Sequence, residues 1–293
     1  MFNKISLVEL FCSVDDFCSH FEPAWNAETI GDRSLKCEMA MSEILTIIIL
    51  FQTSGFRCFK YFYAHILQHH RRDFPKILSY TRFVEIKRRY IIPLTMFFNY
   101  NLGECTGISY VDSTPLKICH NKRIYQHKVF KDIAKRGKST MGWFFGFKLH
   151  IVTNENGELL AAECTQGNVD DRSVIQNLCK SVKGIMFGDR GYISEKLFQE
   201  MMEKGLRIVT ALRAKMKPML MTWNDSELLK KRSMIESVFH IFKDMLHVDH
   251  TRHRSHANFI VNILGALCAY SIYPNKPGIR IGGLKTADAS LIV

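Results

Sequence analysis

The segment Gly107-Ile-Ser-Tyr-Val-Asp112 is a short apolar run that ends in an aspartate, and Gly184-Ile-Met-Phe-Gly-Asp189 repeats this pattern. Apolar runs of about four to eight residues that are bounded by Gly or polar residues are typical of buried β-strands. Each predicted strand would carry a carboxylate to the edge of a sheet. Asp112 and Asp189 are therefore the first candidates for a shared acidic site.

A third acidic residue, Glu236, lies in a segment with helical periodicity. Its apolar positions share one face of the predicted helix and its charged positions share the other, because residues three or four apart return to the same side. The apolar face consists of Ile235, Val238, Phe239, Phe242 and Leu246, and the charged face consists of Arg232, Glu236, His240 and Lys243. A carboxylate can bind a metal ion while neighbouring cations hold phosphates, a combination that suits phosphodiester chemistry.

The composition indicates a folded protein with a polyanionic partner. Of the 293 residues, 47% are hydrophobic and 23% are charged, which is typical of globular proteins. Lys and Arg number 40 against 28 Asp and Glu, a formal net charge of +12. Such a charge favours nucleic acid as the partner, followed by an anionic membrane. A generally basic protein without such a partner is the alternative interpretation.

The cysteines and the apolar segments indicate the compartment. None of the nine cysteines forms a Cys-x-x-Cys pair, so neither a zinc ribbon nor a disulfide framework is visible. Glu9 interrupts the N-terminal apolar run before it reaches the length of a signal peptide. The longest apolar stretch, from Ile44 to Phe51, is far shorter than the roughly twenty residues that span a bilayer. We therefore expect a cytoplasmic protein that does not insert into membranes.

Residues 1–100 are predicted to form a helical domain. Apolar residues recur at three- and four-residue spacing over 4–21, 40–52, 56–70 and 80–98, with expected turns near Pro23, Gly55 and Pro75. Basic and aromatic residues alternate over 56–72 and 80–89, which suits a helix that binds DNA. An amphipathic core helix with solvated charges fits these two segments equally well.

Residues 101–274 are predicted to form an α/β domain with a mixed five-stranded sheet and helices on both faces. In the predicted strand 143–151, Trp143, Phe145, Phe147, Leu149 and Ile151 are expected on one face, with Lys148 and His150 on the other. Helices are expected after Asp170 or Asp171, after Ser194, around Glu236 and over 257–273, and a polar connection over 213–229. We expect residues 275–293 to be a mobile tail. The predicted strands are 107–112, 143–151, 159–164, 184–189 and 206–211.

Several of these motifs together resemble a known family. The spacing of Arg232, Glu236 and Lys243 is similar to the C-terminal signature of bacterial DDE transposases with an RNase H-like core. The remaining blocks of that family have counterparts in the same order, so the chain most closely resembles insertion-sequence family 982 over roughly residues 105–245. These blocks are Asp112-Ser-Thr-Pro, 143–150, 167–171 and 188–192. Related transposases have a tyrosine three residues before the arginine, where this chain has Leu229.

The resemblance implies an RNase H-like fold, in which the first and fourth strands lie side by side and make Asp112 and Asp189 neighbours. It also implies a DNA transposase that binds the terminal inverted repeats of an insertion sequence, cuts the DNA there and joins the freed 3′-hydroxyls to target DNA. Because two element ends must be held at once, we expect a homodimer on double-stranded DNA. Its expected location is the bacterial cytoplasm, at the nucleoid.

The three acids are expected to bind metal. Phosphodiester transfer needs an activated nucleophile and a stabilised leaving oxygen, which two Mg²⁺ ions about 3.5 to 4 Å apart provide. We expect Asp112 to bridge both ions and Asp189 and Glu236 to bind one each, with Mn²⁺ able to substitute for Mg²⁺. Taken singly, each Asp is equally explained as a residue of a strand-end turn, and Glu236 as a solvated helix residue.

Basic residues around these acids are expected to contact DNA. A loop from Lys117 to Lys138 carries eight Lys and Arg residues, and phosphate contacts from such a loop add affinity that depends on salt. A mobile, solvated loop is the alternative. The predicted DNA-contacting residues are Arg232, Lys243, Arg190, Tyr192, Lys117, Lys122, Arg123 and Lys128.

Two other functions fit the same residues. A DNA-binding regulator that has the scaffold without the catalysis would explain the positive charge and Leu229. A repair or recombination nuclease would explain the acids without transposition. DNA binding without metal-dependent cleavage would favour the regulator, and equal cutting of element ends and random DNA would favour the nuclease.

Overall fold

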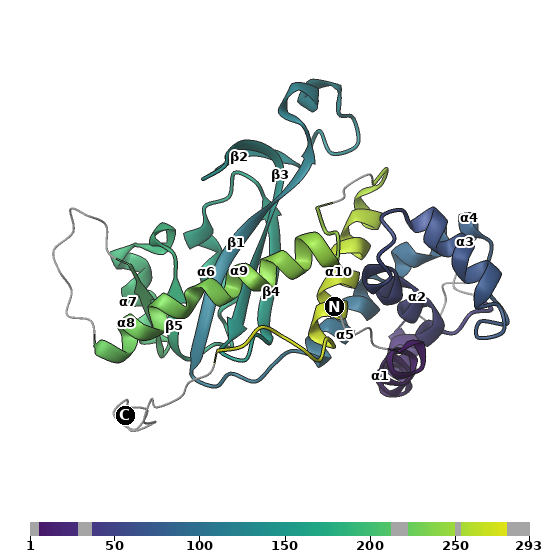
Figure 1. The fold of residues 1–293 in the computed structure, drawn as a ribbon, viewed down its shortest axis with the longest axis horizontal. Coiled ribbons are helices and arrows are strands. Elements are labelled where there is room, and N and C mark those ends of the chain that lie inside the picture. Colours follow the sequence, from purple (N-terminus) through teal and green to yellow (C-terminus); the bar gives the residue numbers. More distant parts are fainter. Residues whose placement is uncertain (1–5, 29–36, 212–221, 250–252, 280–293) are drawn as a thin grey trace. The chain divides into compact units, whose positions relative to one another are not determined.

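The computed structural model describes residues 6–28, 37–211, 222–249 and 253–279 (Figure 1). By packing, the chain divides into two compact units, each built from three separate stretches. The first unit consists of Met1–Leu102, Leu116–Phe147 and His240–Asn275, and the second of Gly103–Pro115, Lys148–Phe239 and Lys276–Val293. The division near residue 100 that the sequence suggests stays a prediction. Residues 280–293 of the expected tail lie outside the described residues.

The first unit is built on helices. Its N-terminal part has α1 (Leu7–Glu28), α2 (Met41–Thr53), α3 (Phe59–His69), α4 (Tyr80–Ile86) and α5 (Ile91–Tyr100), with a 3-10 turn at Lys87–Tyr90 before α5. α10 (His256–Ser271) packs against α2 and α5. A buried hydrogen bond from Gln52 Nε2 to Asn262 Oδ1 (3.0 Å) fixes the register of α2 on α10. Among the described residues, no helix has both the length and the apolarity that a bilayer crossing requires.

Two details of these helices differ from the expectation. Helix α1 continues through Pro23, where we expected a turn. The rings of Phe17 and Phe21 stack at 5.2 Å and those of Phe21 and Trp25 at 5.9 Å, so one aromatic row spans the proline. This packing offsets the one hydrogen bond that a proline removes from a helix. The expected single helix over 80–98 is divided by the 3-10 turn.

The sheet is mixed and has six strands. They are β1 (Ile108–Cys119), β2 (Lys135–Ser139), β3 (Gly142–Asn154), β4 (Leu159–Gln166), β5 (Gly184–Gly188) and β6 (Leu206–Thr210). The order is β2-β3-β1-β5-β6, with β4 also paired to β3. β1, β5 and β6 are parallel neighbours, whereas β2 and β3 are antiparallel. The mixed RNase H-like fold is therefore confirmed, with the first and fourth core strands, β1 and β5, side by side.

The expectation of five strands is wrong by one, because residues 135–139 of the basic loop pair with β3. β1 is also longer than expected and continues beyond Asp112 to Cys119. Residues 222–229 of the expected polar connection are described, and from Trp223 they belong to α8 (Trp223–Lys230). Residues 213–221 of that connection lie outside the described residues.

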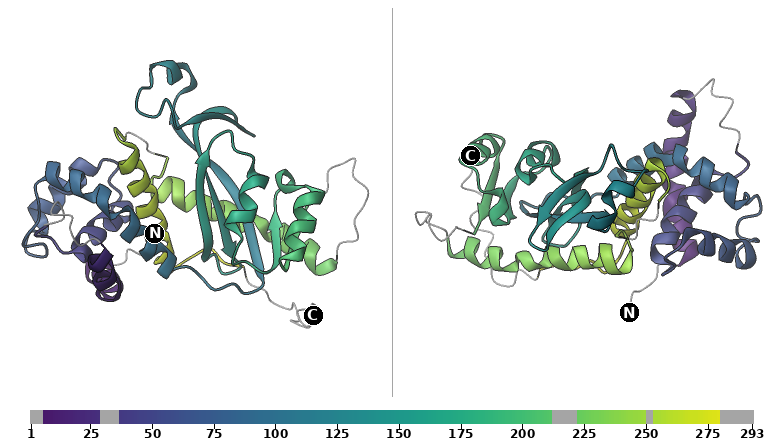
Figure 2. Two further views of the ribbon diagram at one scale, coloured as in Figure 1. Left: turned by 180° about the vertical axis from the view of Figure 1, so that it is seen from behind. Right: turned by 90° about the horizontal axis from the view of Figure 1, so that it is seen from above.

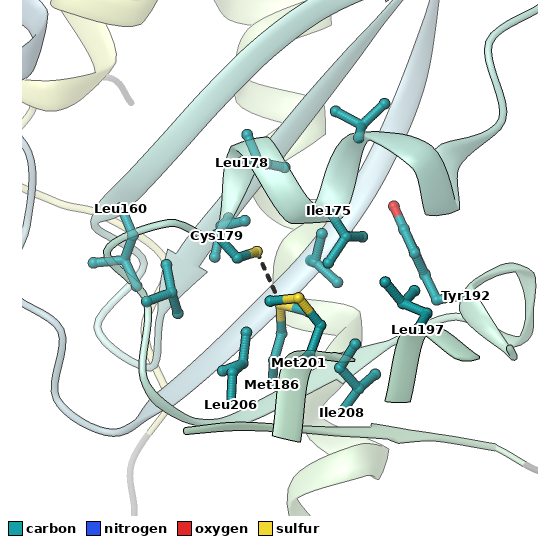
Figure 3. Packing of buried hydrophobic residues seen from close by; sticks show 14 residues of the cluster. Leu160, Ile175, Leu178, Cys179, Met186, Tyr192, Leu197, Met201, Leu206 and Ile208 are labelled. Atoms are coloured by element: carbon teal, nitrogen blue, oxygen red, sulfur yellow. Dashed lines mark hydrogen bonds between the residues drawn. The ribbon is translucent and has the colours of Figure 1, made fainter. Parts of the chain in front are cut away.

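Alternation along the parallel strands builds two layers in the second unit. Val111, Met186 and Ile208 face a buried cluster with α6 (Asp171–Leu178) and α7 (Glu195–Glu203), shown in Figure 3. Tyr110 and Phe187, the partners in register on β1 and β5, point to the other face, where their rings stack at 5.4 Å. The Tyr110 hydroxyl donates to the carbonyl of Leu228 in α8 (3.3 Å). Figure 2 shows α6 and α7 on one face of these strands and α8 on the other.

A glycine contact holds the start of β5 against the residue before β1. Gly184 has φ +93°, and a Cβ there would meet the carbonyl oxygen of Gly107 at 2.3 Å. Gly184→Ala is expected to lower the free energy of unfolding by about 3 kcal/mol or more, measured by urea titration. Gly107→Ala is the control, since Gly107 has the same φ with no atom within 4 Å of its Cβ position. Equal losses in both variants would show that backbone strain alone matters.

An ion pair joins α8 to β6. Arg207 donates to both carboxylate oxygens of Asp225 at 2.8 and 2.9 Å, and the Asp225 side chain is only 4% exposed. Burial raises the pKa of Asp225, but the hydrogen bonds from Arg207 and Thr222 outweigh burial and leave the pKa below its usual value. Breaking a buried ion pair by removing one charge is costly.

Asp225→Asn is therefore expected to cost about 2 to 4 kcal/mol of unfolding free energy at pH 7. A carboxyl whose pKa is lowered by folding contributes its stability above the pKa of the unfolded chain. The difference between the two proteins should thus shrink as the pH falls through the folded pKa of Asp225. Glu85→Gln is the control, because Glu85 pairs with Arg82 at 3.3 Å where both side chains are about half exposed, and it should cost under about 0.5 kcal/mol.

Candidate active site

Two acids meet where β1 and β5 run side by side. Tyr110 is in register with Phe187, so continuing the pairing by two residues places Asp112 beside Asp189. Neighbouring strands are about 4.8 Å apart. Asp112 is two residues after Tyr110, and Asp189 is two residues after Phe187. Because side chains alternate along a strand, both carboxylates belong to the face of the sheet on which α8 packs. The structure thus brings Asp112 and Asp189 together, as the family resemblance implies.

Asp112 is half-buried and held on both oxygens. Its Oδ1 accepts the backbone N–H of Ser113 (2.8 Å), and its Oδ2 accepts Nη1 of Arg232 (2.9 Å). Burial raises the pKa of Asp112 to about 6, against the lowering effect of these two contacts, and the charge of Asp189 raises it further. Asp189 itself is exposed and accepts the backbone N–H of Arg190 (2.6 Å).

Glu236 comes from a different element. It lies on α9 (Met234–His240), where Ile235 and Val238 are fully buried and the Glu236 side chain is 64% exposed. Arg232 links it to the aspartates, because Nη2 of Arg232 is 3.5 Å from Glu236 Oε1 while Nη1 binds Asp112. Within the described residues, no three acidic, His or Cys side chains stand in a metal-ligating arrangement. The Arg232 side chain thus contacts both Asp112 and Glu236.

The three acids nevertheless fit divalent cations in their chemistry. All would contribute carboxylate oxygens, which Mg²⁺ and Mn²⁺ prefer. The half-buried carboxylate of Asp112 lies beside a second one, and the Arg232 side chain offsets their charge only in part. A cation bound between them would compensate this negative charge. The roles of the three acids as ligands stay predictions.

The residues predicted to contact DNA near the acids lie in different environments. Arg190 is exposed directly after Asp189, whereas Tyr192 is only 2% exposed. Burial, together with the charges of Asp112, Asp171 and Asp189, raises the pKa of Tyr192 well above its usual value. This placement suits Tyr192 to packing rather than to contact with a duplex.

Lys243 lies in a π-helical turn at Ile241–Met245, where Leu246 N–H bonds to the Ile241 carbonyl (2.9 Å). A π turn changes the helical phase on which the alignment of Lys243 with Glu236 was predicted. Lys243 also belongs to the first compact unit, while the acids belong to the second. Its predicted phosphate contact stays a prediction.

The basic loop belongs to the first unit and is strongly exposed. Lys117 lies on β1, and Lys122 and Arg123 lie on a 3-10 turn at Asn121–Gln126. Lys128 lies two residues after this turn. All four side chains are exposed. Two aromatic side chains of the same region are also exposed, Tyr125 at 90% and Trp143 at 60%. Trp143 was expected on the same face of its strand as Phe145 and Phe147, which are buried. Its position at the start of β3, opposite Lys138 of β2, explains the exposure.

One polar group beside the acids was not predicted from the sequence. Asp170 caps α6 by accepting the N–H of Arg172, whereas Asp171 binds side chains from the sheet. Its partners are Ser113 of β1 and Lys148 of β3. Lys148 and His150 alternate along β3 between large apolar residues, a period-two pattern that marks one face of a strand and was the only available signal.

Comparison with known proteins gives one family. The family model described as "Transposase DDE domain" matches residues 102–256. No curated protein matches the sequence. Solved structures that are similar to this chain include two transposase complexes, each with 10% sequence identity. The piggyBac transposase synaptic complex with hairpin DNA aligns over 92% of this chain and 75% of its own, with a TM-score of 0.47. The Mos1 strand transfer complex aligns over 85% and 87%, with a TM-score of 0.24.

The matched region contains every acid of the candidate site. It begins at Leu102, one residue before the first stretch of the second unit, and ends at His256, the first residue of α10. Asp112 and Asp189 lie between these ends. Glu236 and Arg232 also lie within it. Because the family model matches more than half of the 293 residues, the chain belongs to the family of transposase DDE domains.

Proposed function

We propose that this chain is a DNA transposase that binds the ends of an insertion sequence, cuts the DNA there and transfers the strands to target DNA. The observation that carries the proposal is the pairing of β1 with β5, which sets Asp112 beside Asp189 in a transposase domain. Motifs that resemble insertion-sequence family 982 support a bacterial element as its substrate, and a cytoplasmic protein at the nucleoid.

Asp112, Asp189 and Glu236 are the residues that would hold two divalent cations. When bound, such a pair activates the attacking hydroxyl and stabilises the leaving oxygen of a phosphodiester. Arg232 lies between Asp112 and Glu236, and its planar guanidinium can hold a phosphate oxygen as well as a carboxylate. The half-burial of Asp112 limits the access of water to its carboxylate and strengthens its interaction with any cation.

The charge of the chain supports double-stranded DNA as the partner. The exposed Lys and Arg residues of 117–138 provide phosphate contacts outside the acidic site. Joining two element ends to one target requires two active sites, so we infer a homodimer on the terminal inverted repeats and the target DNA.

The proposal is tested with DNA that carries the element's terminal repeat, identified as short inverted repeats that flank the coding region. The purified chain is incubated with this duplex, with a scrambled duplex and with a target plasmid, in Mg²⁺, Mn²⁺ or EDTA. We expect cleavage at the repeat boundary and joined products only with a metal ion. Binding without cleavage would favour a DNA-binding regulator, and equal cutting of both duplexes would favour a repair nuclease.

A further inference from the structure

Beside the candidate site, a polar network joins β1, β3 and α6 within the second unit. Asp171 is its centre, because Oδ1 accepts Nζ of Lys148 (2.7 Å) and Oδ2 accepts Oγ of Ser113 (3.0 Å). Lys148 Nζ also donates to the carbonyl of Val169 (2.9 Å), so the ammonium is held by α6 and the turn before it. The Lys148 side chain is 14% exposed and the Asp171 side chain 28%.

The network ends at Asp112. Ser113 follows Asp112 in β1, and the strand alternation turns its side chain to the α6 face while Asp112 points to the other. The backbone N–H of Ser113 donates to Asp112 Oδ1 (2.8 Å). Three consecutive hydrogen bonds therefore connect the Lys148 ammonium, through Asp171 and Ser113, to one carboxylate oxygen of the candidate site.

Two buried polar atoms border this network. Nδ1 of His150 lies 3.9 Å from Asp171 Oδ1 and has no hydrogen-bond partner, while its Nε2 meets Thr165 Oγ1 (2.8 Å). The Tyr192 hydroxyl is also buried without a partner. In Figure 3 this hydroxyl points away from the aliphatic and sulfur-containing cluster. Within the described residues, the side chains of Lys148 and Ser113 donate hydrogen bonds to Asp171.

We propose that Lys148 and Asp171 are positioning residues that hold Ser113, and through its N–H the carboxylate of Asp112, in the orientation that binds a divalent cation. This inference rests on the proposed function, because it assumes that Asp112 is a metal ligand. Partners that orient metal-binding side chains typically change metal affinity by about 10- to 100-fold when they are removed.

The sign of the effect separates positioning from simple electrostatics. Lys148→Met removes a positive charge near the site, so Coulomb interactions alone would strengthen the binding of a cation. Loss of the network instead frees Asp171 and Ser113, and we expect the affinity for Mn²⁺ to fall about tenfold. The measurement is the binding of Mn²⁺ to the full chain without DNA. The electron paramagnetic resonance signal of the free ion reports how much Mn²⁺ remains unbound. Unchanged or tighter binding would overturn the proposal.

Two variants that keep the charge, Ser113→Ala and Lys148→Arg, extend the test. Ser113→Ala removes only the hydroxyl, and we expect Mn²⁺ binding to weaken severalfold. In an Asp171→Asn background the same change should have no further effect, since both residues belong to one chain of contacts. Lys148→Arg keeps a cation on β3 and should retain most of the affinity. Additive losses from Ser113 and Asp171 would contradict the proposed connection.

Asp225→Asn is the control for a loss of stability. Asp225 pairs with Arg207, which is in register with Ile185, four residues and roughly 13 Å along the strand from Asp189. We expect this variant to unfold more easily but to bind Mn²⁺ like the wild type; a matching loss of binding would overturn the proposal. If the wild-type chain and Asp112→Asn bind Mn²⁺ equally, the proposed metal site itself fails, which is a different result from an unaffected Lys148→Met.

Discussion

Asp112→Asn is expected to abolish metal-dependent DNA cleavage, with a rate at least about a thousandfold below that of the wild type. The side chain keeps its size, and its remaining oxygen can still accept one of the two hydrogen bonds, from the Ser113 N–H or from Arg232. The other carboxylate oxygen becomes an amide nitrogen. A neutral amide binds Mg²⁺ weakly, and a loss of about 4 kcal/mol of transition-state stabilisation corresponds to a thousandfold in rate. The measurement is single-turnover cleavage of end DNA.

The variant should remain folded. Ionised Asp112 carries a desolvation cost, which is why burial raises its pKa to about 6, and the amide removes this cost while weakening the contact with Arg232. We therefore expect a thermal midpoint within a few degrees of the wild type. Asp225→Asn is the matched control, since it loses the same charge and more stability but should still cleave. Cleavage by Asp112→Asn at the wild-type rate would exclude Asp112 from catalysis.

The position of each aspartate at the end of a buried strand could be predicted because it depends on local pattern. Each follows a short apolar run, and side chains on a strand alternate with a fixed period, so parity alone places Asp112 and Asp189 on the same face once the strands are neighbours. The starts of α7 and α6 were predictable for a similar reason, since Ser194 and Asp170 accept N–H groups from the first turns of these helices. The resemblance supplied the order of the strands.

The surroundings of the acids could not be predicted from pattern. Asp171 has the sequence context of a helix cap, and only the packing of α6 against β1 and β3 shows that Lys148 and Ser113 bind it. Likewise, nothing in the sequence around Tyr192 distinguishes a buried hydroxyl from an exposed one. These features arise from contacts between residues far apart in the chain, which propensity and periodicity do not encode.

The basic loop shows the same limit at the level of secondary structure. Residues 135–139 include Lys135, Arg136 and Lys138, and this composition favours a solvated loop. They form β2 because β3 offers a free edge on which Gly137 lies opposite Phe144 and is buried. A charged strand at the edge of a sheet is common, since charge discourages further pairing.

Glu236→Gln is expected to reduce cleavage by about a hundredfold or more while DNA binding changes little. The reason is its position: Glu236 is exposed on α9, and in the structure it meets Asp112 only through the guanidinium of Arg232. Its contribution therefore appears when cations and DNA are present. The free energy of unfolding should not change, because other residues form the buried face of α9.

The control lies on the same helical run. Glu227 of α8 is also partly exposed and pairs with a basic residue, Lys230, at 2.6 Å, so Glu227→Gln makes the same chemical change two and a half turns earlier. It should leave cleavage within about twofold of the wild type. If both variants cleave alike, α9 does not supply the third acid, and Asp112 with Asp189 must recruit another carboxylate. If only Glu236→Gln fails, the third acid comes from α9.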